Sequence, residues 1–163
     1  MTEPKDVGLR WAVKRSFLDY VARTPDGRAY VAGGVRANAD GEVIFPPAEP
    51  LEAAVATDTR VFAFGGEVRY LAHGGLLHVI IADPVLTVTG DAGVLTVAAV
   101  DEEDQPTRIE LVTFTVGVRA LESAPTTWES SEVRLTADGA TVFGGVYSAG
   151  ELMAPLHVHL PPR

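Results

Sequence analysis

Residues 85–97, VLTVTGDAGVLTV, hold two runs rich in valine, leucine and threonine on either side of a turn with two glycines. β-branched residues favour extended backbone, and glycine and aspartate between two such runs are typical of a tight connection between antiparallel strands. This stretch therefore predicts a β-hairpin. Because similar runs recur along most of the chain, the same pattern predicts a mainly β fold.

The rest of the chain repeats this pattern of short apolar runs and turn residues. Residues 108–116, RIELVTFTV, alternate apolar and polar side chains, as a strand with one solvent-facing side does. Predicted strands lie near 29–37, 42–45, 61–72, 76–82, 85–90, 94–100, 108–117, 131–136, 140–147 and 156–160. We expect a polyproline-like connection at 46–51 and a long loop at 120–130. No linker or repeat divides the chain, so residues 1–163 are predicted to form one antiparallel β-sandwich of about ten strands.

One helix is predicted, near the N-terminus, over residues 9–20. Leu9, Val13, Phe17 and Tyr20 recur at spacings of four, four and three residues, which places them on one face of an α-helix. The sequence TPDG at 24–27 is a stop signal for a helix. Tyr20 is therefore expected at the end of the helix.

Charge and cysteine content exclude several classes of function. The formal net charge is −9, which argues against nucleic-acid binding because phosphate contacts need a basic surface. Residues 1–36 are an exception, with seven Lys or Arg and four acidic residues, so a basic helix could receive an anionic ligand or simply be solvated. The absence of cysteine excludes disulfides, thiolate metal sites and thioether attachment of heme. No motif of an activated serine or a phosphate-binding loop is present, so the chain is not expected to be an enzyme.

Targeting signals are also missing from the sequence. Residues 1–6, MTEPKD, contain no apolar core of a signal peptide. No run of about 18 apolar residues is present, so no membrane span is predicted. The expectation is a cytoplasmic protein, secreted only if a leader has been removed. The sequence does not indicate an oligomeric state.

Several motifs, in order, resemble the heme-transport-associated (HtaA) domain family of actinobacterial heme-uptake proteins. The first is Leu-x-Trp-x-Val-Lys-x-Ser-Phe-x-x-Tyr at 9–20. The others are Phe45-Pro46, the turn AHGGLL at 72–77, Asp83-Pro84, LTADG at 135–139, FGGVY at 143–147, and Gly150 followed by Pro155-Leu156. The resemblance runs from about residue 8 to residue 160, close to the whole chain.

The resemblance implies a non-catalytic protein that binds ferric heme, in heme uptake, transfer or storage, with a protein partner if heme is passed on. It implies that Tyr20 is the axial ligand to iron, that His73 on the glycine turn is hydrogen-bonded to that tyrosine, and that Tyr147 lines the pocket. Tyrosine does serve as an axial ligand to heme iron. A free phenol has a pKa near ~10, so a neighbouring imidazole would help by taking or sharing the phenolic proton.

Two alternatives remain open on the residues alone. A tyrosine on the apolar face of a helix is commonly a core residue, and a histidine before a strand is commonly part of a turn. The chain could then be a β-sandwich module that binds a protein partner or an apolar small molecule instead of heme. Separately, His157 and His159 are spaced to point to one face of a strand and could share a metal ion, although exposed histidines at a sheet edge fit the same spacing.

Overall fold

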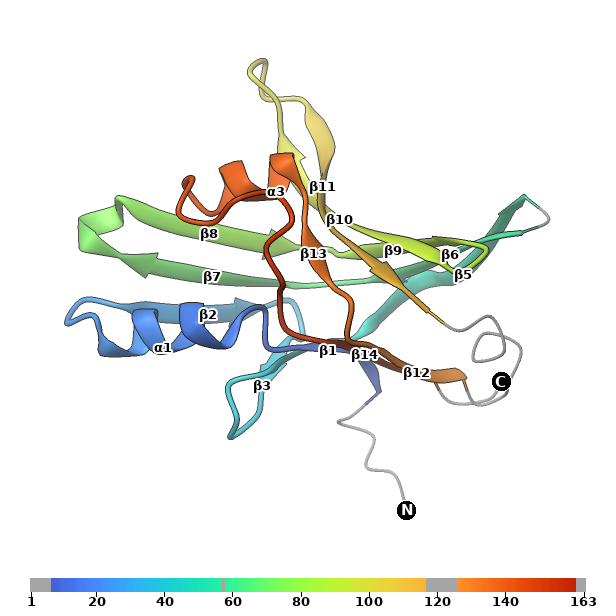
Figure 1. The fold of residues 1–163 in the computed structure, drawn as a ribbon, viewed down its shortest axis with the longest axis horizontal. Coiled ribbons are helices and arrows are strands. Elements are labelled where there is room, and N and C mark those ends of the chain that lie inside the picture. The colour runs from blue at the N-terminus through green and yellow to red at the C-terminus, as the bar shows by residue number, and fades with distance from the viewer. Residues whose placement is uncertain (1–6, 57, 117–125, 161–163) are drawn as a thin grey trace.

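The computed structural model describes residues 7–56, 58–116 and 126–160. Strands dominate and form three antiparallel sheets, with one main helix near the N-terminus (Figure 1). The expected mainly β fold with an N-terminal helix is confirmed. None of the helices in the described ranges is long and apolar enough to cross a membrane.

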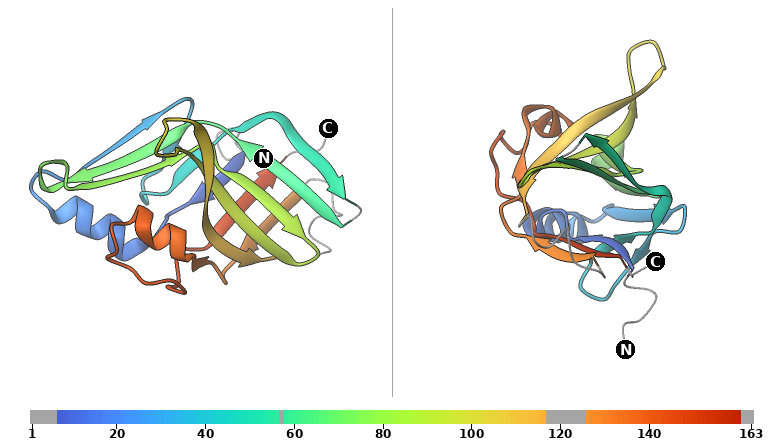
Figure 2. Two further views of the ribbon diagram at one scale, coloured as in Figure 1. Left: turned by 90° about the horizontal axis from the view of Figure 1, so that it is seen from above. Right: turned by 90° about the vertical axis from the view of Figure 1, so that its right-hand side faces the viewer.

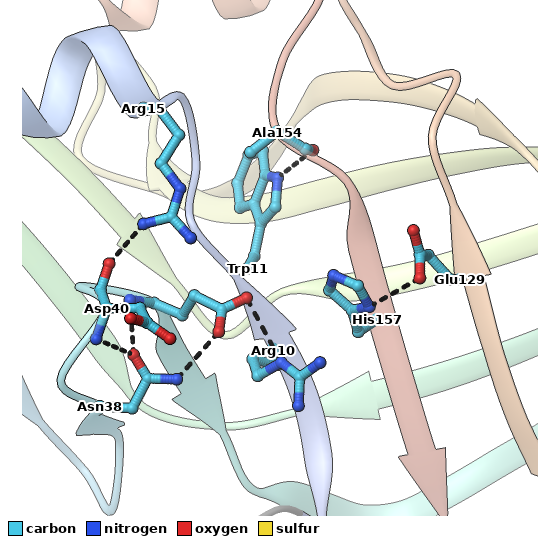
Figure 3. Close-up of polar contacts among 9 residues, drawn as sticks. Arg10, Trp11, Arg15, Asn38, Asp40, Glu129, Ala154 and His157 are labelled. Atoms are coloured by element: carbon cyan, nitrogen blue, oxygen red, sulfur yellow. Dashed lines mark hydrogen bonds and ion pairs between the residues drawn. The ribbon is translucent and has the colours of Figure 1, made fainter.

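The five-stranded sheet joins the two ends of the described chain. Its order is β12 (Thr126–Ser130), β14 (Leu156–Leu160), β1 (Gly8–Trp11), β4 (Val43–Phe45) and β3 (Arg36–Ala37). Leu9 lies opposite Val158 on one side and Phe45 on the other. Trp11 is fully buried, and its indole Nε1 donates a hydrogen bond of 2.8 Å to the carbonyl oxygen of Ala154 (Figure 3). This bond connects the first strand to the segment that leads into the last one.

The six-stranded sheet contains the hairpin predicted from residues 85–97. Its order is β13 (Arg134–Leu135), β11 (Pro106–Thr115), β10 (Ala92–Val100), β9 (Val85–Thr89), β6 (Thr59–Phe64) and β5 (Pro47–Ala56). Thr89 pairs with Ala92 across the predicted turn. A side chain at position 93 has no room, because a β-carbon there would lie 2.3 Å from the Phe114 ring. The two larger sheets face each other across a common apolar core (Figure 2).

The three-stranded sheet and the two helices gather at one end of the molecule (Figure 1). The sheet consists of β2 (Arg28–Ala32), β7 (Glu67–Ala72) and β8 (Leu77–Ala82), and the 3-10 turn η2 (His73–Gly75) connects β7 to β8. Helix α1 (Arg15–Arg23) buries Phe17 and Val21, which are four residues apart and thus on one face. Helix α3 (Ala137–Val142) ends at Phe143, whose ring contacts that of Phe17 in α1. These elements position the candidate site.

The boundaries predicted for the N-terminal helix are wrong. Residues 8–11 form β1, whose register with β14 and β4 satisfies its backbone groups on both sides. Leu9 and Trp11 are two residues apart and both are buried. This spacing is the two-residue repeat of a strand and not the 3.6-residue repeat of a helix. The helix begins only after Val13, which has the positive φ of 60° that turns the chain. It continues to Arg23, so Tyr20 lies within its last turn.

The strand predicted over 140–147 is also wrong, because α3 occupies the first part of it. The Thr136 hydroxyl accepts a hydrogen bond of 2.8 Å from the Gly139 amide, which caps the helix start, and Asp138 lies in the first turn. Both are ordinary signals of a helix start. Positive φ angles at Gly144 and Gly145 then turn the chain toward Tyr147.

Other segments differ in detail. A polyproline-like connection was expected at 46–51, but residues 47–51 belong to strand β5 (Pro47–Ala56). The predicted strands 29–37 and 61–72 are each divided in two, at Gly33-Gly34 and at Gly65-Gly66. Of the expected loop at 120–130, residues 126–130 form β12, and residues 120–125 lie outside the described part of the chain.

Candidate functional site

A cleft of about 540 Å³ opens at the end of the molecule where α1, η2 and the segment after α3 meet. Tyr20, His73 and Tyr147 all line this cleft, although they come from three distant parts of the chain. The other lining residues are Ser16, Phe17, Arg23, Leu76, Leu77, Gly144 and Val146. The structure therefore brings together all three residues that the resemblance associates with heme.

The Tyr20 hydroxyl is in short hydrogen-bond contact with His73 Nε2. The two ring centroids are 5.6 Å apart and the ring planes are inclined by 51°. Tyr20 keeps 43% of its surface exposed, so its hydroxyl is held at the cleft and not in the core. The orientation follows from the helix, because burial of Phe17 and Val21 directs the adjacent face, with Tyr20, toward η2.

The backbone around His73 is fixed by a carboxylate outside the cleft. His73 has a φ of 56° and Gly74 a φ of 66°, a left-handed turn that is unusual for a histidine. Asp26 Oδ1 accepts a hydrogen bond of 3.0 Å from the His73 amide, and Oδ2 accepts one of 2.7 Å from the Gly74 amide. These bonds, that of Gly74 first, lower the pKa of the Asp26 carboxyl below its usual range. The ionised Asp26 thus holds the turn that presents the imidazole.

Apolar side chains form the walls of the cleft. Leu76 is 93% exposed and Val146 is 70% exposed, and they belong to loops from different parts of the chain. Large apolar side chains with so much exposed surface are unfavourable in water unless something covers them. The arrangement suits a ligand that places broad apolar surface against these loops.

A row of aromatic rings supports the cleft from below. Phe17 makes edge contacts with Tyr70, at 5.1 Å between centroids, and with Phe143, at 5.2 Å. Phe143 in turn contacts the Tyr147 ring at 5.8 Å. The Lys14 ammonium lies 5.4 Å from the centroid of Tyr147. Packing of this kind fixes the floor of the cleft and the position of Tyr147.

His157 and His159 lie elsewhere, on β14 of the five-stranded sheet. His157 Nδ1 is 3.4 Å from a carboxylate oxygen of Glu129 (Figure 3), and His159 Nδ1 is 2.8 Å from the Thr127 hydroxyl. In the described ranges no group of three or more His, Cys, Asp or Glu residues is arranged to hold a metal ion. The two imidazoles each have a neighbouring side chain as partner, and neither belongs to the cleft.

Three residues that line the cleft, and Asp26 outside it, were not identified from the sequence. Arg23 follows Tyr20 by three residues and shares its helical face, and a correct helix end at residue 23 would have revealed it. Asp26 is in a recognisable turn, but its partners are 47 and 48 residues away, which no local pattern indicates. Leu76 and Val146 looked like ordinary apolar residues of predicted strands.

Comparisons with known proteins give a consistent result. The family model of HtaA domains, described as Htaa, matches residues 6–159. Among solved structures, the C-terminal domain of HtaA from Corynebacterium glutamicum is 24% identical with a TM-score of 0.71, covering 93% of this chain and 94% of that one. The N-terminal domain of the same protein is 21% identical with a TM-score of 0.72, covering 93% and 95%. The protein described as heme binding protein HtaB from that organism is 21% identical with a TM-score of 0.71, covering 95% and 92%.

Curated proteins gave no match. The solved structures are too distant in sequence to establish more than the shared fold. The family model, in contrast, extends over nearly the whole described chain, including β1, α1, η2 and β14. The chain therefore belongs to the HtaA family.

Proposed function

We propose that this protein binds ferric heme in the cleft, without catalysing a reaction, with the Tyr20 oxygen as the ligand to iron and His73 as the hydrogen-bonding partner of that oxygen. The observation that carries the proposal is the contact between the Tyr20 hydroxyl and His73 Nε2 at an exposed, apolar-walled cleft. A volume of about 540 Å³ is within the range of roughly 300–1,000 Å³ typical of small-molecule sites.

The chemistry of the residues fits this ligand. The phenolate, not the phenol, is the form that binds iron, and bound ferric heme would supply the positive charge that favours it. His73 Nε2 can accept the phenolic hydrogen or, when protonated, donate to the phenolate. Asp26 keeps the imidazole in place through the backbone of the turn. Leu76, Leu77 and Val146 would cover the faces of a flat apolar ring.

Family membership supports a heme-related binding or transport role for this chain. The protein described as a heme binding protein, HtaB, shares the fold over most of both chains. Transfer to or from another protein would follow from the exposed position of the cleft.

Titration of the heme-free protein with ferric heme tests the proposal. We expect a saturable change in absorption that includes a tyrosinate-to-iron charge-transfer band. Tyr20→Phe should abolish that band, and His73→Ala should shift it and weaken binding. Matched controls are Tyr30→Phe and His78→Ala, because both residues are exposed and do not line the cleft.

Two results would contradict the proposal. If Tyr20→Phe and Tyr30→Phe bind heme with the same spectrum as the unaltered protein, Tyr20 is not the ligand. If the unaltered protein gives no spectral change but an apolar fluorescent probe binds in the cleft, the chain is a binding module for another apolar ligand. Loss of probe binding in a Leu76→Ser variant would locate that ligand in the same cleft.

A further inference from the structure

We propose that Arg23 selects the ligand of the cleft by pairing with a free carboxylate at the edge of a tetrapyrrole. The inference rests on the proposed heme site and adds a residue to it, because it concerns which porphyrins are accepted and not how iron is held. Arg23 would make the cleft prefer a ring with ionised acid side chains over the same ring with esterified ones.

The first observation is the charge of the cleft lining. Arg23 is the one lining residue with a permanent charge, since the others are aromatic, aliphatic, glycine, serine or histidine. It lies on the same helical stripe as Ser16 and Tyr20, at spacings of four and three residues. Its guanidinium is therefore carried on the same side of α1 as the proposed ligand to iron.

The second observation is that Arg23 is available. Its side chain is exposed, and among the described residues it makes a single long hydrogen bond, 3.3 Å, from Nε to the Asp19 carbonyl oxygen. No carboxylate in the described part of the chain forms an ion pair with it. Asp26, three residues away, has both oxygens occupied by the amides of His73 and Gly74. The terminal nitrogens of Arg23 can thus donate to a ligand.

The third observation concerns the other cation near the cleft. Lys14 lies over the Tyr147 ring, but its ammonium donates to the Leu152 carbonyl oxygen at 2.9 Å and lies 3.2 Å from a Glu151 carboxylate oxygen. The positive charge of the Lys14 ammonium is therefore already balanced by the Glu151 carboxylate. Of the two cations, Arg23 is the one that can neutralise an anionic group of a bound molecule, and its planar fork matches a carboxylate bidentately.

The physical consequence is a difference between ligands. A carboxylate placed against apolar walls such as Leu76 and Val146 would lose hydration, so a ring with free acids binds well only where a cation meets them. At a half-open site, removal of that cation should weaken binding on the order of fivefold. An esterified ring has no charge to compensate and should not respond to the removal.

The experiment compares ferric heme with its dimethyl ester, titrated in the same buffer at low and at high salt. The proteins are the unaltered chain, Arg23→Gln, Arg23→Lys and Arg15→Gln. Arg15→Gln is the matched control, because it removes one arginine from the same helix, where the guanidinium is bonded to the Asp40 carbonyl outside the cleft. We expect a preference for the free acid in the unaltered chain and in Arg15→Gln, lost in Arg23→Gln and partly kept in Arg23→Lys. The charge-transfer band should be the same in all four.

The outcomes separate the two proposals. If Arg23→Gln keeps the same ratio of affinities for acid and ester as Arg15→Gln, the role of Arg23 is wrong, while a band that depends on Tyr20 leaves the heme site intact. If the unaltered chain binds both ligands equally at low salt, Arg23 again has no selective role. If neither ligand binds, both proposals fail together.

Discussion

At the scale of single residues, the candidate site depends on a carboxylate that does not line it. Asp26 binds the backbone of the turn that presents His73, and His73 contacts the Tyr20 hydroxyl. The three residues therefore form a chain from the end of α1 to η2 and back to α1. Loss of Asp26 should leave the fold unchanged and alter only the position of the imidazole.

The pH dependence of the contacts between Asp26 and the turn that presents His73 follows from the pKa of Asp26. Its pKa is lowered from 3.8, so the folded state binds this proton less readily than the unfolded state does. The hydrogen bonds to Asp26 therefore contribute fully to stability above the pKa that its carboxyl has in the unfolded state. This contribution is lost as pH falls through the lower pKa of the folded state. In NMR spectra, the amide protons of His73 and Gly74 should titrate together below pH 3.8.

A matched variant checks the same prediction. Asp26→Asn removes the titrating carboxylate and one of its two acceptor oxygens, so both the His73 and the Gly74 amide should lose their shift change with pH, and heme titrations should show weaker binding near neutral pH. Asp19→Asn, on the exposed side of α1, should change neither. An unchanged titration of both amides in Asp26→Asn would show that Asp26 does not anchor the turn.

The sequence identified Tyr20, His73 and Tyr147 because each lies in a motif of the resembled family. It did not identify Arg23 or Asp26, for different physical reasons. Arg23 was missed because the helix was ended one turn too early. The bonds of Asp26 connect residues 47 and 48 positions apart, and such pairs are set by the tertiary fold and not by local spacing.

At the scale of elements, α1 is packed through Phe17 and Val21, and its aromatic contacts are those of Phe17. Phe17 is buried between Tyr70 and Phe143, and through them it connects the helix to β7 and to the residue that ends α3. The helix has nine residues and no side-chain cap at its start, so its intrinsic stability is low. Packing of this ring keeps the helix, and hence Tyr20, in place.

Truncation of the ring tests this. Phe17→Ala should lower the free energy of unfolding by about 3–5 kcal/mol, measured by urea denaturation, because it removes a buried aromatic ring. Tyr70→Phe is the control in the same cluster. The Tyr70 hydroxyl is buried and has no hydrogen-bond partner among the described residues, and burial raises its pKa, so its removal should leave stability equal or up to about 1 kcal/mol higher. Equal losses in both variants would contradict this account.

The elements also show where sequence patterns succeed. The hairpin at 85–97 was predicted because its turn residues and β-branched runs agree with the tertiary pairing. Residues 9–13 were misassigned because Leu9 and Val13 fit a helical spacing as well as a strand, and the choice was made by pairing with β14 and β4. The partner β14 begins 145 residues after Trp11, so no local window contains the information.

At the scale of the whole molecule, Trp11 and Ala154 connect the beginning and the end of the fold. The indole is fully buried in the common apolar core, and its Nε1 bond to the Ala154 carbonyl joins residues 143 positions apart in the sequence. The Ala154 amide also donates to the Val13 carbonyl oxygen at 2.8 Å. These bonds fix the segment before β14 next to the start of α1.

Trp11→Phe should therefore reduce stability more than an ordinary aromatic exchange. It leaves a buried carbonyl without this donor and a cavity beside it, a loss of about 2–4 kcal/mol in the free energy of unfolding. Trp128→Phe is the control, because the Trp128 Nε1 has no hydrogen-bond partner among the described residues. A smaller loss at Trp11 than at Trp128 would show that the Ala154 bond contributes nothing.

The position of β14 between β1 and β12 has a consequence for biosynthesis. During synthesis, residues 8–11 leave the ribosome well before their neighbour β14, which begins 145 residues after Trp11. Until then the nascent sheet has an open slot at its centre, and pairing over such a separation is slow. The sheet can therefore be completed only after β14 has been synthesised, and a chaperone that shields the unfilled slot would act before that point.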